Sequence, residues 1–142
     1  MNIKFKITTP EKTVYEDEIY QATLPVADGE VTILPNHRSY IASLKSGEII
    51  LKKKNKEKEI DLAISGGFIE FHNNELIVLA DTAERAEEID LERAEEAKKR
   101  AEDIKKQRVS MDEVEYARVA AMLEKELARV KVARKYSERR GM

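Results

Sequence analysis

The strongest constraint on the fold of this 142-residue chain is an abrupt change of sequence pattern near Thr82. All three prolines, and every glycine except Gly141, lie before this position. Glycine and proline disfavour helix interiors, so they divide the first part into short segments and leave the second part free to form long helices. The chain is therefore expected to contain two structurally different parts.

The first part shows the alternation of half-buried β-strands. Ile3, Phe5 and Ile7 alternate with polar residues, and further short apolar runs are separated by turn residues such as Asp28-Gly29. A parallel sheet would require crossover helices, and no helical pattern fits between these runs. This part is therefore predicted to be an antiparallel sandwich or barrel. The further runs lie around 14–24, 31–34, 39–44, 48–52, 60–64, 68–71 and 76–80.

The second part is predicted to be a helical hairpin, because its apolar residues recur every three or four positions. A capping box from Ser110 to Glu113 is expected to start the second helix. The two helices are expected at 90–107 and 111–136. The first helix offers mostly alanine to its partner, so the hairpin is expected to be held weakly. The apolar positions are Leu91, Ala94, Ala97, Ala101 and Ile104, then Val119, Leu123, Leu127 and Val130.

These patterns predict an α+β chain with an antiparallel β domain, a sandwich or barrel, at 1–83 and a two-helix antiparallel hairpin at 84–142; of these two, the β-sandwich is the fold expected for the first domain once the motifs described below are included. The formal net charge of -2 and a pI near 5.8 do not suggest a nucleic-acid partner. No apolar run approaches the roughly 18 residues of a membrane span, and the first residues lack the apolar stretch of a signal peptide. An intracellular chain is expected, which still permits docking onto a membrane complex.

Residues with catalytic or metal-binding chemistry are scarce in the first part. The chain has no cysteine, which excludes disulfides and thiolate sites. His37 and His72 have no second ligand at metal spacing, so they are expected to be turn or surface residues. Gly66-Gly67 is too short for a phosphate-binding loop, and no serine lies in a nucleophile elbow. An enzyme is therefore the least expected class.

The start of the predicted first helix has two interpretations. Asp90 is a good N-cap residue, and Arg93 and Arg100 are seven residues apart and lie on one face. In the first interpretation, Asp90 only caps the helix and the arginines pair with glutamates at i±4 on solvated faces. In the second, the hairpin forms a cationic cleft whose arginine forks bind phosphate oxygens. The second helix carries cations at related spacing, namely Arg118, Lys125 and Arg129.

Several motifs resemble the epsilon subunit of bacterial F-type ATP synthases. The stretch 24–37 resembles the N-terminal signature of this family, and so does Ser65–Phe68 followed by Val78–Ala83. Their order and spacing match throughout, and the helical hairpin follows at the same place. The family usually has Pro-Gly-His-Ala-Pro where this chain has Pro35–Ser39. Asn36 replaces the glycine and tolerates the left-handed conformation, so the turn is expected to survive.

The resemblance implies a non-catalytic rotor subunit of the ATP synthase central stalk. In the family, the sandwich packs against the gamma subunit and sits on the c-ring, which couples ion-driven rotation to ATP synthesis. The implied location is peripheral, at the cytoplasmic face of the plasma membrane, with membrane contact only through the complex. The helices lie folded on the sandwich or extend into the alpha/beta catalytic head and inhibit ATP hydrolysis. An alternative remains open, a β-sandwich and coiled-coil adaptor without nucleotide sensing.

Some family members bind ATP on the folded hairpin through the pattern Ile/Leu-Asp-x-x-Arg-Ala and further arginines. This chain carries the pattern from Ile89 to Ala94, but Lys125 stands where those members have another arginine. Lysine keeps the charge and lacks the planar bidentate fork. The resemblance therefore implies ATP as a regulatory ligand, with no required cofactor. The implied ATP-binding residues are Glu84, Ile89, Asp90, Arg93, Ala94, Arg100, Arg118, Lys125 and Arg129.

A basic run follows near the end of the predicted second helix. If the hairpin opens, these cations are expected to meet acidic loops of the beta subunits. In the simpler interpretation, they form a solvated helix end that is favoured by the helix dipole. The run consists of Arg129, Lys131, Arg134, Lys135, Arg139 and Arg140.

Overall fold

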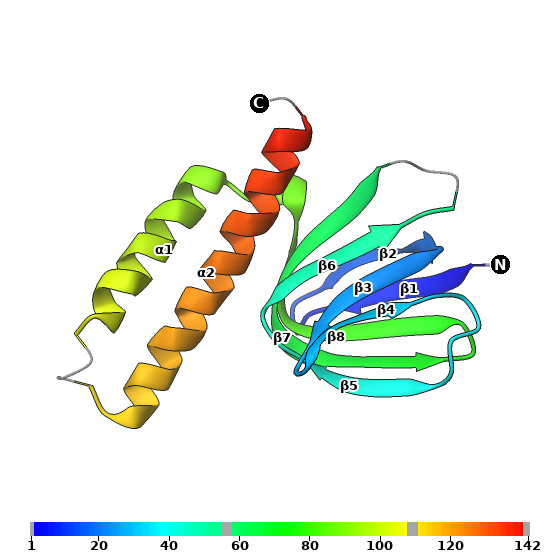
Figure 1. Cartoon of the computed structure of the whole chain (residues 1–142), viewed down its shortest axis with the longest axis horizontal. Helices are drawn as coiled ribbons and strands as arrows, with labels where there is room; N and C mark the ends of the chain where they lie inside the picture. The colour runs from blue at the N-terminus through cyan, green and yellow to red at the C-terminus, as the bar shows by residue number, and fades with distance from the viewer. Residues whose placement is uncertain (1, 55–57, 108–110, 141–142) are drawn as a thin grey trace.

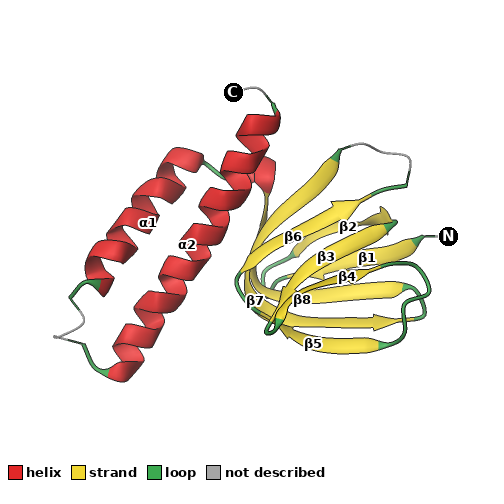
Figure 2. Ribbon diagram, in the orientation of Figure 1, coloured by secondary structure: helices red, strands yellow, loops and turns green. Residues whose placement is uncertain are grey.

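A computed structural model describes residues 2–54, 58–107 and 111–140. Eight strands in these ranges form a β-sandwich, and two antiparallel helices follow it (Figures 1 and 2), so the predicted fold class is confirmed. The strands are β1 (Ile3–Thr8), β2 (Thr13–Ile19), β3 (Gln21–Val26), β4 (Gly29–Ile33), β5 (Tyr40–Leu44), β6 (Gly47–Lys52), β7 (Glu59–His72) and β8 (Glu75–Arg85). The helical elements are η1 (Ala86–Glu88), α1 (Leu91–Lys105) and α2 (Glu113–Arg139).

The strands form one hydrogen-bonded sheet that folds over on itself. Their order is β2-β1-β8-β7-β5-β3-β4, and β6 pairs with both β3 and β7. Among the described pairs, only β1 and β8 run parallel. The predicted antiparallel arrangement therefore holds for all described pairs except β1 and β8, which are connected through the strands between them.

The burial of side chains in β1 follows the predicted alternation, whereas β7 departs from it. Ile3, Phe5 and Ile7 are buried in the sandwich core, and their polar neighbours are exposed. In the first half of β7, Asp61 and Ala63 are buried in addition to the core residues. Their burial reflects the position of α2, which packs over this outer face and covers both sides of the strand.

The turn that departs from the family pattern is intact. Asn36 adopts the left-handed conformation with φ 68°, as predicted. Its backbone N–H donates to Oδ1 of Asn74 at 2.6 Å, which ties the β4–β5 loop to the β7–β8 turn. His37 lies in this loop, edge-on to the ring of Phe71, and His72 is exposed. Both histidines therefore occupy the turn and surface positions that were expected.

The hairpin lies beside the sandwich, with α2 between α1 and the strands (Figure 1). The predicted start of the second helix was wrong: Asp112 is the N-cap, and its carboxylate accepts from the Glu115 N–H at 2.8 Å. Ser110 of the predicted capping box lies outside the described residues. α2 also continues beyond the predicted end at residue 136, because Arg139 in its last turn contacts the sandwich.

Candidate functional site

The junction between β8 and α1 positions the residue that was predicted to cap the helix. β8 ends at Arg85, two residues beyond the predicted boundary, and η1 follows directly. Ile89 and Asp90 have extended backbones, and Oδ1 of Asp90 accepts a hydrogen bond from the Arg93 backbone N–H at 3.1 Å. Asp90 is therefore the N-cap of α1, as predicted.

Ile89 and Ala94 belong to a second apolar cluster, between the hairpin and the sandwich. Ala94 is fully buried, and Ile89 is nearly so. The structure thus surrounds both side chains with protein rather than presenting them at an open surface. Small residues dominate this interface, in agreement with the alanine-rich stripe seen in the sequence. The cluster consists of Ala63, Ala86, Ile89, Ala94, Ala128, Val130, Val132 and Ala133.

Four of the predicted cations have no ionic partner in the described part of the chain. Arg93 and Arg100 of α1 and Arg118 of α2 are exposed, and Lys125 is half-buried. Among the described residues, none of their side chains makes a hydrogen bond or an ion pair. The pairing with glutamates at i±4 that the simpler interpretation requires is therefore not found for these four residues.

Arg129 is the exception, because it is held by two carboxylates. Its Nε lies 2.8 Å from Oε1 of Glu84 at the end of β8, and its Nη1 donates to Oε2 of Glu126 at 2.8 Å. Burial lowers the pKa of the guanidinium, but the two carboxylates outweigh this effect and the net direction is upward. Glu126 was missed in the sequence, although its i−3 spacing to Arg129 was a visible signal.

The two helices bring only some of the nine predicted residues together. Nη2 of Arg134 donates to Oε1 of Glu95 at 2.8 Å. This contact shows which residues of the two antiparallel helices lie side by side. Counting from this pair in opposite directions places Arg100 level with Arg129. Arg118 lies eleven residues before Arg129, about 16 Å along the helix. Arg118 therefore lies toward the loop end of the hairpin, away from the Glu84–Arg129 ion pair.

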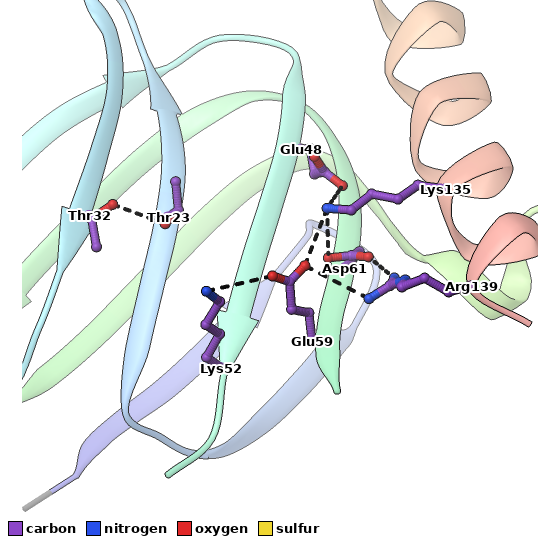
Figure 3. A network of polar contacts seen from close by, with 8 residues as sticks. All are labelled: Thr23, Thr32, Glu48, Lys52, Glu59, Asp61, Lys135 and Arg139. Atoms are coloured by element: carbon purple, nitrogen blue, oxygen red, sulfur yellow. Dashed lines mark hydrogen bonds and ion pairs between the residues drawn. The ribbon is translucent and has the colours of Figure 1, made fainter. Parts of the chain in front are cut away.

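A group of ion pairs that the sequence did not reveal joins α2 to the sandwich (Figure 3). Glu48 of β6 and Glu59 and Asp61 of β7 form an acidic face under the helix. Lys135 Nζ lies 3.2 Å from Glu48 and 3.3 Å from Glu59, and Arg139 pairs with Asp61. Lys135 and Arg139 of the basic run are thus docked on carboxylates, whereas Arg140 is exposed and donates to the Tyr136 hydroxyl.

The buried position of Asp61 alters the ionisation of this group. Burial raises the pKa of the Asp61 carboxyl above its usual range, and Lys135 and Arg139 oppose this change only in part. Burial lowers the pKa of Lys135, but Asp61, Glu48 and Glu59 outweigh it, so the net direction is upward. The ammonium of Lys135 is therefore kept charged by the acidic face.

A different face of the sandwich carries an exposed apolar patch. Phe68 is 60% exposed, and Leu79 on the paired strand is 56% exposed. Ile41 on β5 is 75% exposed, and Ile77 extends the patch along β8. The strand register places all four on one side of the sheet, opposite the core residues. Exposed apolar groups of this kind mark docking surfaces.

Two family models match nearly the whole chain. Residues 2–86 match the β-sandwich domain of the ATP synthase delta/epsilon chain, and residues 87–134 match its long α-helix domain. The chain belongs to the delta/epsilon chain family of ATP synthases. The resemblance to the epsilon subunit that the motifs indicated is thus confirmed.

Individual relatives extend this match along the chain. The ATP synthase epsilon chain of Desulforamulus reducens is 43% identical over 92% of this chain and 96% of that protein. The epsilon chain of Dehalococcoides mccartyi is 42% identical over 97% of this chain and 94% of that protein. A chain of the Euglena gracilis mitochondrial ATP synthase has a similar fold, with a TM-score of 0.77, 22% identity, and coverage of 93% of this chain and 81% of that one.

Two further properties concern membranes and metals. In the part of the chain that the structure describes, each helix is too short or too polar to cross a bilayer. Within the same ranges, no three histidine, aspartate or glutamate side chains are arranged to hold a metal ion.

Proposed function

We propose that this chain is a non-catalytic central-stalk subunit that couples rotation to ATP synthesis and senses ATP through its helical hairpin. Arg93, Arg100 and Lys125 have no ionic partner among residues 2–54, 58–107 and 111–140, and this observation carries the sensing part of the proposal. Arg93 and Arg100 lie two turns apart on one face of α1, and Lys125 lies on α2, nearer the loop between the helices. Cations placed in this way are suited to a polyanionic ligand, since arginine forks bind phosphate oxygens bidentately. Family membership supports the rotor part.

ATP would act by stabilising the folded hairpin. A ligand that binds only this state stabilises it by RT ln(1 + [L]/Kd), which is about 2.7 kcal/mol at a hundred times Kd. The interface under the hairpin consists mainly of alanine and valine, so a contribution of this size is able to shift its stability. When ATP is scarce, α2 would leave the sandwich, enter the catalytic head and inhibit ATP hydrolysis.

The residues of the site fit a triphosphate in charge, and one of them requires rearrangement. Arg129 donates to Glu84 and Glu126, so a phosphate must share or replace these carboxylates. Asp90 caps α1 and keeps one oxygen free of that bond for the ribose or the adenine amino group. Lys125 supplies charge without a fork. We infer that ATP binds as a regulatory ligand and is not hydrolysed here.

Calorimetric titration of ATP into the isolated chain tests this function. Wild type is expected to give saturable binding, and Arg93→Ala to weaken it about ten- to a hundredfold, the loss of one charge-assisted interaction. Lys99→Ala is the matched control, because it removes one exposed positive charge from another side of α1. No saturable heat with wild type would refute ATP sensing and favour the ligand-free adaptor. Equal affinity for Arg93→Ala would remove Arg93 from the site.

The apolar patch supports docking of the sandwich on the gamma subunit, next to the c-ring. Through this complex the chain would lie at the cytoplasmic face of the membrane, without contacting lipid itself. Phe68→Ser is expected to weaken binding to gamma about tenfold or more, because it removes a large exposed apolar side chain. Binding of the purified subunits is the measurement, and Lys54→Ser, at an exposed position after β6 and beside the opposite half of β7 from Phe68, is the control. Unchanged binding of Phe68→Ser would place the gamma contact elsewhere.

A further inference from the structure

The contact between α2 and the sandwich is built around a buried carboxylate. The side chain of Asp61 has no exposed surface, and its compensating charges come from α2. Arg139 Nη2 pairs with Oδ2, and Lys135 Nζ lies 3.8 Å from Oδ1. Within the described part of the chain, Oδ1 accepts no hydrogen bond. Asp61 therefore depends on α2 for the compensation of its charge.

The neighbours of Asp61 on the sheet increase this dependence. Glu59 precedes Asp61 by two residues on the same face of β7, and Glu48 lies on the adjoining strand with a side chain that is 7% exposed. Three negative charges thus face the helix. Of the strand residues that the structure describes, only Lys52 forms an ion pair with one of them, 3.7 Å from Glu59. The opposing cations of α2 recur every four residues and lie on one stripe: Lys131, Lys135 and Arg139.

A buried ion pair contributes little net stability, yet it penalises any state in which one member is missing. Removing both charges from water costs nearly as much as their attraction returns. Removing one partner leaves an uncompensated buried charge, which is strongly unfavourable. Consequently, Asp61 does not hold α2 more firmly than an apolar residue would. It makes the docked position available only to a helix that supplies the matching cations.

We propose that Asp61, with Glu48 and Glu59, is an electrostatic latch that makes docking of α2 conditional on Lys135 and Arg139. The latch sets the balance between docked and released α2, and so rests on the proposed movement of this helix. Docking neutralises the cationic stripe, and release exposes it. Figure 3 shows the residues of the latch. An open recess of about 960 Å³ beside them gives solvent access to one side of Arg139.

The rate of thiol labelling at one buried position measures the release of α2. The chain has no native cysteine, so Val132→Cys introduces a unique thiol. Val132 is fully buried and lies three and seven residues before Lys135 and Arg139, on the stripe that faces the sandwich. A thiol reagent reaches this position only after α2 lifts away. The labelling rate of the full chain, without partners or ATP, therefore follows the released fraction.

Arg139→Ala in this background is expected to label about ten- to a hundredfold faster. This factor is smaller than the loss of a fully buried partner would give, because the side chain of Arg139 is partly exposed and its charge is screened by solvent. Arg140→Ala is the matched control, because Arg140 donates to the Tyr136 hydroxyl and not to the sandwich. Its rate is expected to stay within about twofold of the background. Asp61→Leu combined with Arg139→Met is expected to restore the background rate or slow it further, because Glu48 and Glu59 keep Lys135 as a partner and no buried charge is left without one.

Three results would overturn the latch. The first is labelling of Arg139→Ala at the background rate, and the second is an acceleration by Arg140→Ala as large as that by Arg139→Ala. The third is labelling of the double variant as fast as Arg139→Ala. If Asp61→Leu prevents folding, as judged by circular dichroism, the uncharged polar pair Asp61→Asn with Arg139→Gln replaces it under the same criterion. A background chain that never labels would instead refute the proposed movement of α2, which distinguishes the two failures.

Discussion

Replacing Gly67 with alanine is expected to lower the free energy of unfolding of the sandwich by more than about 3 kcal/mol. Gly67 has φ +129°, a conformation that residues with a Cβ rarely adopt. An added Cβ would overlap the carbonyl oxygen of Leu79 and lie 2.8 Å from Cα of Ala80. Both groups belong to the backbone of the paired strand β8, so neither can move without disturbing the sheet. Urea unfolding followed by circular dichroism measures the loss.

Gly29→Ala separates backbone strain from steric overlap. Gly29 has nearly the same φ, +133°, but an added Cβ there would have no atom within 4 Å. This variant is expected to lose only the strain energy, about 1–3 kcal/mol. The difference between the two variants is therefore the cost of the contact with β8. Equal losses at the two positions would contradict the close approach of Gly67 to Leu79 and Ala80.

Phe71→Ala is expected to destabilise the sandwich by about 3–5 kcal/mol. Phe71 is 1% exposed and is among the largest fully buried side chains of the core. Truncation removes its burial from water and leaves a cavity that the surrounding strands cannot fill by simple collapse. The measurement is again urea unfolding of the isolated chain, with the midpoint and the slope determined separately.

Phe68→Ala provides the control within the same strand. Phe68 lies three residues before Phe71 but points to the opposite face, where it is 60% exposed. The same truncation is expected to change the free energy of unfolding by no more than about 0.5 kcal/mol. A large loss at Phe68, or a small one at Phe71, would contradict the assignment of the two faces of β7.

Local sequence patterns predicted the elements whose stability depends on nearby residues. The alternation of Ile3, Phe5 and Ile7 indicated the face of β1 that is buried. Asp90 was recognised as an N-cap because the bond that it accepts comes from a residue only three positions later. Asn36 was expected to sustain a left-handed turn, since that capacity belongs to the residue itself. In each case the interacting groups are close in the chain.

The same approach failed where a distant partner changes the energy. The burial of Asp61 was not foreseen, because its position in a strand with alternating polarity suggested an exposed face. Its partner Arg139 is 78 residues away, and nothing near Asp61 in the chain announces it. The pairing of Arg129 with Glu84 spans 45 residues. The sequence suggested these two residues as ligand contacts, and the structure shows that they also contact each other.

The composition and periodicity of the chain were sufficient to define an antiparallel β domain followed by a helical hairpin, and its motifs were sufficient to indicate its family and, with it, the sandwich. Periodicity, turns and caps reflect energies that are set within a few residues, so they are visible in the order of amino acids. The seating of α2 on an acidic face, and the free or paired state of each cation on the hairpin, depended on the three-dimensional packing. The cost of a buried charge is set by the groups that folding brings beside it, however far away they lie in the chain.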